Sequence, residues 1–195
     1  MKKSVIGFNQ KLSSEDDRDY YITSDLHFWH KGVLGFCPDT RPYKDVEEMN
    51  QELITHWNSK VKGGDVVFSL GDFCFKAKQA TQDIIDQLNG DIVWIKGNHC
   101  YKVFGQLGLP SCDYLEVRYD GVKVCMMHYP ISCWNQQGRG SVMLHGHSHG
   151  VFGGNGRILD VGWDSVGEII TLKDAVDRCL SKEIFCPDHH KVVEE

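Results

Sequence analysis

Hydrophobic residues in the middle of the chain gather in short continuous runs, and glycine or polar residues end each run. Apolar runs of about four to eight residues that are rich in Val and Ile are typical of strands buried on both faces. We therefore predict six buried strands, over residues 20–23, 66–70, 92–95, 122–127, 142–144 and 158–161.

Three other segments have hydrophobic residues three and four positions apart, the spacing that gives a helix one apolar face. The first helix is predicted over residues 46–57, where one face contains Val46, Met49, Leu53, Ile54 and Trp57. The second is predicted over residues 78–88 and ends at Asn89-Gly90. The third is predicted over residues 172–180, after Thr171 as the capping residue.

Strands and helices alternate in the first half of the chain, and strands dominate the second half before the last helix. This order predicts an α/β fold in which parallel βαβ units lead into a mixed or antiparallel half. With 195 residues, 41% of them hydrophobic and 25% charged, the chain has the size and composition of one globular domain. We predict a single domain over residues 1–195, with residues 1–17 and 188–195 as loose terminal segments.

The formal net charge of −6 argues against non-specific binding to nucleic acid, which usually depends on clustered Lys and Arg side chains. No segment approaches the roughly 20 apolar residues of a membrane span, and the first apolar segment is too short for a secretory signal. We therefore expect a cytoplasmic protein without membrane association. The eight cysteines form no C-x-x-C pair, so we expect mainly buried reduced thiols. Cys100 is the exception and is expected to be reactive.

Five short polar blocks contain the candidate chemistry, and most of them directly follow a predicted strand. They are Asp25-Leu26-His27, Gly71-Asp72, Gly97-Asn98-His99, His128 and Gly146-His147-Ser148-His149. Because the carboxyl ends of parallel strands meet at one edge of a sheet, we expect the blocks to converge. Any single block is more commonly a turn, a cap or a solvated histidine, but the ordered occurrence of all five favours one metal site.

The residue types in these blocks suit divalent cations. The carboxylate of Asp72 has two oxygens and can bridge two ions, and the glycine before it allows close approach. Asn98 offers an amide oxygen as a neutral ligand. His147 and His149 lie on the same side of an extended segment, so each can bind one of two neighbouring ions.

In this order, the blocks resemble the motifs of the calcineurin-like metallophosphoesterase superfamily, which are D-x-H, G-D, G-N-H followed by Asp or Glu, a single His, and G-H-x-H. The resemblance extends from about Tyr20 to Val161 and favours the small bacterial and phage-type phosphoesterases. It implies a four-layer α/β/β/α sandwich with two mixed sheets flanked by helices. It also implies one metal ion on Asp25, His27, Asp72 and His149, and a second on Asp72, Asn98, His128 and His147. The implied cofactors are two divalent ions, with manganese preferred over iron, zinc or nickel.

The resemblance assigns His99 a catalytic role, as the general acid or transition-state donor that meets the leaving group without binding metal. Two positions depart from the superfamily. Cys100 stands where an acidic residue usually follows the histidine, and Phe75 stands where the phosphatase signature G-D-x-x-D has its second carboxylate. The acidic partner of His99 is therefore not identified from the sequence, and Asp113 is one candidate.

Substrate contacts are expected between the first two blocks, in a segment that resembles the D-x-H-F-x-H and R-P-F/Y stretches of small phosphoesterases. His30 and Arg41 are predicted to bind a substrate phosphate, and a salt bridge is the alternative role of Arg41. One of Phe28, Trp29 and Tyr43 would stack on a base. In the alternative, Phe28, Trp29 and Phe36 pack in the core. Lys76 is a further candidate for phosphate binding.

Other polar residues are expected to have no role in the site. His145 is predicted to be structural, and three histidines are predicted to lie on the surface: His56, His189 and His190. Asp160 and Asp164, with the glycines around them, match neither a calcium loop nor a phosphate loop. We interpret this segment as a hairpin turn.

The sequence thus predicts a metal-dependent hydrolase in which a hydroxide that bridges two metal ions attacks a phosphate ester in line. The compact chain and the absence of G-D-x-x-D-R-G favour a phosphodiesterase that acts on a small nucleotide or a cyclic phosphate. The alternatives are a phosphomonoesterase or protein phosphatase, a nuclease, and a non-catalytic metallophosphoesterase-like scaffold that binds a partner protein.

Overall fold

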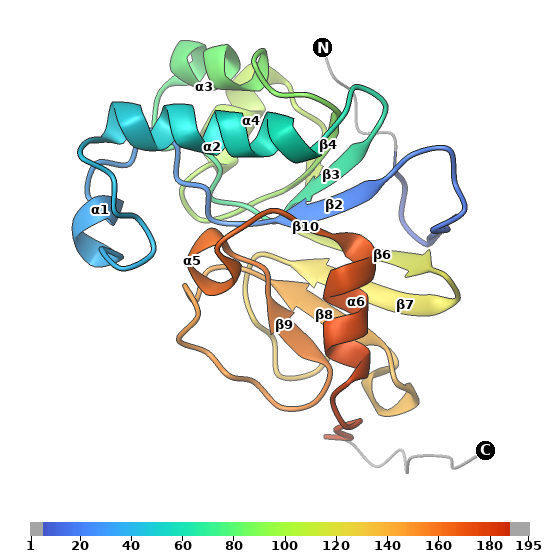
Figure 1. The fold of residues 1–195 in the computed structure, drawn as a ribbon. Helices are drawn as coiled ribbons and strands as arrows, with labels where there is room; N and C mark the ends of the chain where they lie inside the picture. Colours follow the sequence, from blue (N-terminus) through green and yellow to red (C-terminus); the bar gives the residue numbers. More distant parts are fainter. Residues whose placement is uncertain (1–5, 188–195) are drawn as a thin grey trace.

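Two five-stranded β-sheets pack face to face at the centre of the protein (Figure 1). The computed structural model describes residues 6–187. The first sheet has the order β10-β2-β3-β4-β5, with the strands Ile170–Thr171 (β10), Tyr20–Thr23 (β2), Val66–Ser69 (β3), Asp91–Ile95 (β4) and Ser111–Cys112 (β5). The second sheet has the order β1-β6-β7-β8-β9, with the strands Gln10–Leu12 (β1), Tyr114–Tyr119 (β6), Val122–Met127 (β7), Val142–His145 (β8) and Ile158–Asp160 (β9).

Each sheet contains parallel and antiparallel pairs. In the first sheet, β2 to β5 are parallel and β10 is antiparallel to β2. In the second sheet, only the pair of β6 and β7 is antiparallel. Helices flank the sheets, so the predicted α/β sandwich with two mixed sheets is confirmed.

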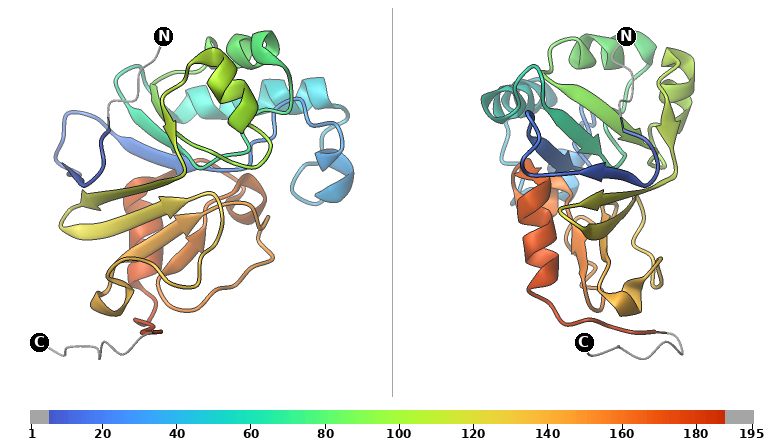
Figure 2. Two further views of the ribbon diagram at one scale, coloured as in Figure 1. Left: turned by 180° about the vertical axis from the view of Figure 1, so that it is seen from behind. Right: turned by 90° about the vertical axis from the view of Figure 1, so that its right-hand side faces the viewer.

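Three helices cover the face of the first sheet that points away from the second sheet (Figures 1 and 2): Val46–Lys60 (α2), Lys78–Ile85 (α3) and Tyr101–Leu107 (α4). The Asp45 carboxylate caps α2 by accepting a hydrogen bond from the Glu48 backbone nitrogen. The apolar face of α2 packs into the hydrophobic cluster beneath the helices. The helices predicted over residues 46–57 and 78–88 are confirmed, although the second ends earlier, at Ile85.

Side chains from both sheets fill the space between them. Phe68 and Leu70 from the first sheet meet Val124 and Leu144 from the second in one buried cluster. The last helix, Leu172–Leu180 (α6), contributes to the same cluster and contacts strands of both sheets. Thr171 caps this helix by accepting a hydrogen bond from the Asp174 backbone nitrogen, as predicted.

Loops cover part of the opposite face of the second sheet. Cys125, Met143 and Ile158 form a separate buried cluster with Trp134, which lies in the loop between β7 and β8. This loop contains the short 3₁₀ helix Gln137–Arg139 (η1). Alternate residues of β7 and β8 therefore bury both faces of the sheet, as expected for strands with continuous apolar runs.

The N-terminal segment corrects one prediction. Residues 1–17 were expected to be loose, but Gln10–Leu12 forms β1, which pairs with β6 at the edge of the second sheet. The polar residues that follow are also held, because the Asp120 carboxylate accepts hydrogen bonds from Ser13 Oγ and the Ser14 backbone nitrogen. The predicted loose segment 188–195 lies outside the described residues. Within residues 6–187, no helix has the length and apolarity of a membrane span.

The sheet topology brings the five polar blocks to one end of the sandwich. Strands β2, β3 and β4 are parallel, so the blocks that begin at Asp25, Gly71 and Gly97 leave the first sheet at the same edge. Strands β7 and β8 are also parallel, so His128 and Gly146 leave the second sheet together. Gly146 donates a backbone hydrogen bond of 3.0 Å to the His128 carbonyl. The predicted convergence at strand ends is therefore confirmed.

Candidate metal centre

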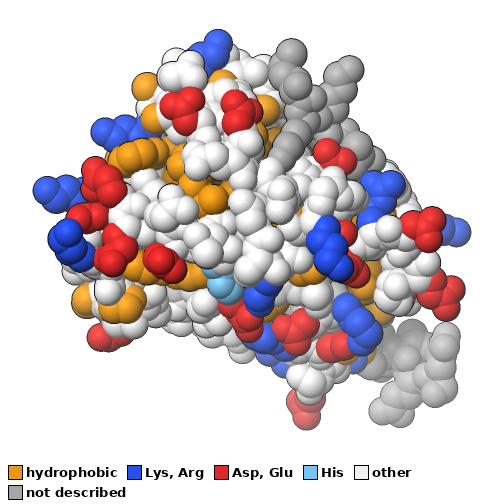
Figure 3. Space-filling model, turned by 45° about the horizontal axis from the view of Figure 1, so that its top comes forward, with side chains coloured by type: hydrophobic (Ala, Val, Ile, Leu, Met, Phe, Trp, Pro, Cys, Tyr) orange, Lys and Arg blue, Asp and Glu red, His pale blue; other side chains and the backbone are white. Residues whose placement is uncertain are grey.

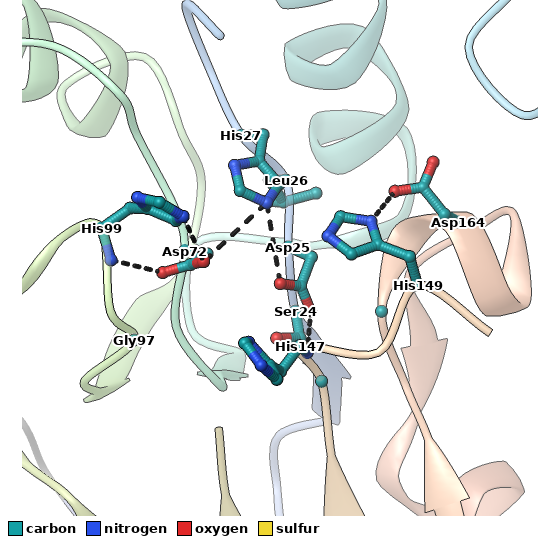
Figure 4. A network of polar contacts seen from close by, with 12 residues as sticks. Ser24, Asp25, Leu26, His27, Asp72, Gly97, His99, His147, His149 and Asp164 are labelled. Atoms are coloured by element: carbon teal, nitrogen blue, oxygen red, sulfur yellow. Dashed lines mark hydrogen bonds and ion pairs between the residues drawn. The ribbon is translucent and has the colours of Figure 1, made fainter. Parts of the chain in front are cut away.

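The backbones of the first two blocks run side by side after β2 and β3 end. The Asp25 nitrogen donates a hydrogen bond of 3.1 Å to the Gly71 carbonyl, and the His27 nitrogen donates one of 2.9 Å to the Asp72 carbonyl. This pairing brings the side chains of Asp25, His27 and Asp72 together, and Figure 4 shows the His27 ring between the two carboxylates.

Predicted ligands occupy unusual backbone conformations. Nine non-glycine residues in the described range have positive φ angles, and five of them are Asp25 (56°), His27 (52°), Asp72 (46°), His147 (69°) and His149 (47°). A non-glycine residue in this region costs of order 1–3 kcal/mol and persists only where the surrounding structure imposes it. At these five positions, the surrounding structure thus imposes a strained backbone that fixes the direction of a predicted ligand side chain. This supports a functional site.

Two glycines of the blocks are required for close approach of the chain segments. A Cβ atom on Gly97 would overlap the Asp72 side chain, and one on Gly146 would overlap Ser24 and the Asp25 carboxylate. Both glycines thus leave room for the carboxylates that they face. Local packing therefore explains why the Gly-Asn-His and Gly-His-Ser-His blocks each begin with glycine.

The first group of candidate ligands consists of Asp25, His27 and His149, whose ligand atoms all lie within 4.8 Å of one another. His27 Nε2 is 3.7 Å from Asp25 Oδ1 and 3.9 Å from Asp72 Oδ2. Asp25 Oδ1 and both ring nitrogens of His27 are buried and have no hydrogen-bond partner among residues 6–187. Buried polar atoms almost always have a partner, so this donor set fits a cation that the side chains would coordinate.

Burial also opposes the charged forms of these groups. It raises the pKa of the Asp25 carboxyl and lowers the pKa of His27 to about 2. An imidazole with so low a pKa is neutral and keeps a lone pair for a metal ion, whereas a bound cation would favour the ionised form of Asp25.

The second group consists of Asp25, Asp72 and His128, again with ligand atoms within 4.8 Å. His128 Nδ1 lies 2.8 Å from the Leu70 carbonyl, so it donates to that oxygen, and Nε2 presents its lone pair to the site. Nε2 lies 3.0 Å from Asn98 Oδ1 and 3.5 Å from Asp72 Oδ2. Such an approach of acceptor atoms is favourable when a proton or a cation lies between them.

Asp25 belongs to both groups, and Asp72, a member of the second, also faces the first, since its Oδ2 atom lies 3.9 Å from His27 Nε2 and 3.5 Å from His128 Nε2. This position of Asp72 suits the bridging role predicted for it. His147 joins the site through its backbone nitrogen, which donates a hydrogen bond of 2.8 Å to Asp25 Oδ2. The His147 ring packs near the His128 ring, with centroids 5.0 Å apart. Five of the seven predicted ligands thus belong to the two groups, Asn98 contacts one of them through its side chain, and His147 is held beside them by its backbone.

Asp164 is part of this site and was not predicted. It lies in the short helix Trp163–Val166 (α5), and its Oδ2 atom is 2.7 Å from His149 Nδ1. Burial alone would raise the pKa of Asp164, but hydrogen bonds from His149 and Arg41 hold it well below its usual range. The ionised Asp164 thus orients His149 so that its other ring nitrogen is available to the site. Residue 164 is therefore not a simple hairpin turn residue.

Asp160, which was assigned to the same hairpin turn, orders the last block. Its carboxylate accepts hydrogen bonds from Ser148 Oγ at 2.7 Å and from the Gly150 backbone nitrogen at 2.8 Å. Asp160 ends β9 and Asp164 follows it by four residues, and carboxylates at the end of a strand are also typical of a turn.

The predicted substrate contact of Arg41 is wrong. Arg41 is only 1% exposed, and its five N–H groups all have acceptors: the two Asp164 oxygens, the Leu26 and Asp25 carbonyls, and Met49 sulfur. No donor is left for a phosphate. The alternative role, a salt bridge, is confirmed, and Arg41 connects the backbone of the first block to Asp164.

The proposed base-stacking residues are also placed elsewhere. Phe28 is fully buried and Trp29 packs against the core beneath the helices, which confirms the alternative of core packing for these two. Tyr43 packs against the same core. Phe36 is 77% exposed, so its predicted core packing is wrong. His30 instead lines a cavity of about 540 Å³ beside the candidate ligands. Lys76 lines an adjoining cavity of about 520 Å³.

His99 lies where these two cavities meet, because it lines both of them. Its side chain is 42% exposed, and its backbone nitrogen donates a hydrogen bond of 2.9 Å to Asp72 Oδ1. His99 Nε2 is 3.9 Å from Asp72 Oδ2, so the structure gives His99 a carboxylate neighbour in Asp72. Asp113 is not the partner, since it is exposed and forms an ion pair with Lys96.

Two further predictions require correction. Cys100 is fully buried, and burial raises the pKa of its thiol, so the expected reactivity is wrong. His56 is half-buried rather than on the surface, and its Nε2 atom accepts a hydrogen bond from the Ile169 nitrogen. His145 is buried beside the Gly146 carbonyl, as expected of a structural residue. His189 and His190 lie outside the described residues.

Comparison with known proteins gives relatives without an assigned activity. No protein-family model matches the chain. The chain is 38% identical over 135 residues to the uncharacterized protein MJ1445 of Methanocaldococcus jannaschii, an alignment that covers 68% of this chain and 70% of that protein. The fold of the present chain is similar to that of AQ665, a protein of unknown function from Aquifex aeolicus with a crystal structure. The TM-score is 0.66, and the sequences are 20% identical over 83% of this chain and 99% of that chain.

Proposed function

Because the chain belongs to the family of the uncharacterized protein MJ1445 of Methanocaldococcus jannaschii, which carries no named activity, we propose its function from the site itself. We propose a dinuclear metal-dependent phosphohydrolase of the calcineurin-like metallophosphoesterase superfamily, with phosphodiesters as substrates. The main support is a set of buried ligand atoms where the five motifs converge: Asp25 Oδ1 and the His27 ring nitrogens have no hydrogen-bond partner in the described part of the chain.

In this proposal, Asp25, His27, Asp72 and His149 hold one divalent ion, and Asp72, Asn98, His128 and His147 hold the other. The hydrogen bonds of His128 to the Leu70 carbonyl and of His149 to Asp164 support these roles, because each fixes which ring nitrogen is free. Imidazole, carboxylate and amide ligands together suit manganese, iron, nickel or zinc, and manganese is our first choice.

Two bound cations would polarise the phosphoryl oxygens and make water a nucleophile near neutral pH. The protein itself contributes a half-exposed imidazole, His99, at the edge of the cavity beside Asp72. His99 would donate a proton or a hydrogen bond to the departing oxygen of the ester, a role that typically contributes about 10²–10⁴-fold.

A small phosphodiester suits the site better than a phosphoprotein. The cavity beside the candidate ligands has a volume of about 540 Å³, which is within the range for small molecules. Phe75 and Lys76 stand where the phosphatase signature G-D-x-x-D-R-G has its second carboxylate and its arginine, so the described site lacks that signature.

The surface argues against broad nucleic-acid binding. On the face shown in Figure 3, Lys and Arg side chains alternate with Asp and Glu side chains rather than forming one basic patch. With the net charge of −6, this distribution lowers the attraction to a phosphate backbone. A cytoplasmic location, where the buried thiols of Cys100 and Cys179 would stay reduced, is part of the same proposal.

The proposal is tested with purified protein reconstituted with manganese, zinc, nickel or iron. We expect two metal ions per chain by elemental analysis, a rise in melting temperature on metal addition, and hydrolysis of bis(p-nitrophenyl) phosphate in preference to p-nitrophenyl phosphate. Asp72→Asn is the matched control and should lose both metal response and turnover. Two bound ions without turnover of either ester would favour the non-catalytic scaffold, and absence of metal binding in the folded protein would reject both functions.

A further inference from the structure

Exposed hydrophobic side chains gather at the cavity beside the candidate metal centre. Phe36 is 77% exposed, Phe75 is 42% exposed and Val151 is 89% exposed, and all three line this cavity. They come from three separate segments, the end of the helix Val33–Phe36 (α1), the segment after β3, and the loop after β8. Exposed apolar side chains that meet at one cavity mark a binding surface more often than a chance arrangement.

Phe75 is held as a flat wall of this cavity. Its ring stacks on the His30 ring with centroids 4.1 Å apart and an angle of 13° between the planes. The His99 ring packs beside the Phe75 ring, with centroids 4.8 Å apart and an angle of 53° between the planes. The backbone is fixed as well, since the Phe75 nitrogen donates a hydrogen bond of 2.8 Å to the Phe28 carbonyl. An aromatic ring fixed in this way costs little further entropy when another ring packs on it.

The wall lies next to the proposed reaction centre. Phe75 and His99 both line the cavity at the metal centre and the adjoining cavity, and so stand at their junction. His27, a candidate ligand, has its ring centroid 6.5 Å from that of Phe75. A group attached to a phosphate at the metal centre would therefore reach Phe75 without leaving the cavity.

We propose that Phe75, supported by His30, binds a planar nucleobase of the substrate by stacking, and that Phe36 and Val151 enclose its apolar side. This inference rests on the proposed phosphohydrolase function and names its substrate class, a nucleoside phosphodiester. The candidate metal ligands, whose ions would bind a phosphate, lie at one end of the cavity, and a fixed aromatic ring lies near them. This arrangement matches a substrate with a phosphate at one end and a flat ring at the other. Phe75 thus selects substrates with a planar base, and it stands where the phosphatase signature has its second carboxylate.

Paired esters with a common leaving group test the inference: thymidine 5′-(p-nitrophenyl phosphate) and methyl p-nitrophenyl phosphate. We expect the wild-type protein to prefer the nucleoside ester in kcat/KM. Phe75→Leu should reduce this preference about tenfold, mainly through KM, whereas Phe75→Trp should retain it because a flat ring is restored. Phe8→Leu, at another exposed phenylalanine that lines a different cavity, should leave the preference unchanged.

Binding of adenosine 5′-monophosphate by calorimetry provides a readout that does not depend on turnover. Phe75→Leu should weaken this binding about tenfold and leave the affinity for inorganic phosphate unchanged, in protein whose melting curve shows that it is folded. Equal losses for both esters, or unchanged nucleotide affinity in Phe75→Leu, would overturn the stacking role. Nucleotide binding without hydrolysis of either ester would instead reject the proposed function while supporting the aromatic site.

Discussion

His149 Nδ1 lies 2.7 Å from Asp164 Oδ2, and the other oxygen of Asp164 accepts a hydrogen bond of 2.8 Å from Arg41 Nε. Arg41 in turn donates to the Leu26 and Asp25 carbonyls in the first motif. A single buried chain of contacts thus connects the last histidine of the site to the backbone of the first aspartate. Outer contacts of this kind orient the ligands of metal sites, and their loss typically costs about 10- to 100-fold in metal affinity.

Replacing Asp164 with Asn should weaken one metal ion selectively. The Asn amide can still accept from Arg41, but its N–H₂ group would face His149 Nδ1 and favour the ring form whose proton points into the site. We expect about 10- to 100-fold weaker binding of one ion and retention of the other, measured by metal titration and elemental analysis. Asp113→Asn, which removes an exposed carboxylate paired with Lys96, is the control and should bind both ions. Equal loss of both ions from Asp164→Asn would contradict the assignment of His149 to one ion.

Replacing Arg41 with Met should lower stability rather than substrate affinity alone. Removal of Arg41 leaves the Asp164 carboxylate buried without its main partner, and loss of one member of a buried pair typically costs about 3–5 kcal/mol. We expect a decrease of this size in the free energy of unfolding, measured by urea denaturation of the metal-free protein. Arg178→Met, which breaks an exposed i,i+4 pair with Asp174, should cost less than about 1 kcal/mol. Similar small losses in both variants, with a raised KM only in Arg41→Met, would restore the role in substrate binding.

These contacts also mark the limit of inference from the sequence. The buried strands β2, β3, β4, β7, β8 and β9 were predicted within one or two residues, because continuous apolar runs depend on local burial alone. β6 was missed since Glu116 and Arg118 interrupt its apolar pattern, and β1, β5 and β10 contain only two or three residues.

The motif residues of the candidate site could be predicted because each motif follows a strand. The Arg41–Asp164 pair joins residues 123 positions apart with no local pattern, and a buried arginine and a phosphate-binding arginine look alike in a sequence.

The free energy of unfolding should decrease in acid, in part because Glu116 becomes protonated. Burial opposes the charge on Glu116, but hydrogen bonds from Lys123 at 2.5 Å, Tyr114 at 2.8 Å and Asn135 at 3.0 Å lower its pKa below the usual 4.5. Since the unfolded chain then binds this proton at higher pH than the folded chain does, the stabilisation is present above pH 4.5 and is lost as the pH falls through the folded-state pKa.

Glu116→Gln checks this contribution. We expect the variant to lose about 1–3 kcal/mol of unfolding free energy at pH 7, because Lys123 is left buried with a neutral partner, and to show a shallower decline in acid. Urea denaturation at a series of pH values from neutral to acidic measures both effects. Glu52→Gln, at an exposed position of α2, should leave the curve unchanged. A decline in acid as steep as that of the wild-type protein would show that other carboxyl groups dominate.

The last prediction separates the two neighbouring residues of the third motif. Asn98 Oδ1 faces His128 Nε2 at 3.0 Å, inside the candidate centre, whereas the His99 ring stands at the cavity edge and reaches no closer than 3.9 Å to Asp72 Oδ2. Asn98→Ala should therefore weaken one metal ion, and His99→Ala should keep both ions while turnover of a phosphodiester falls about 10²–10⁴-fold. Metal content and kcat, measured on the same preparations, distinguish the two effects. Restoration of turnover in His99→Ala by an ester with a better leaving group would support proton donation, because such a group needs no acid, and loss of a metal ion from both variants would show that the two roles are not divided in this way.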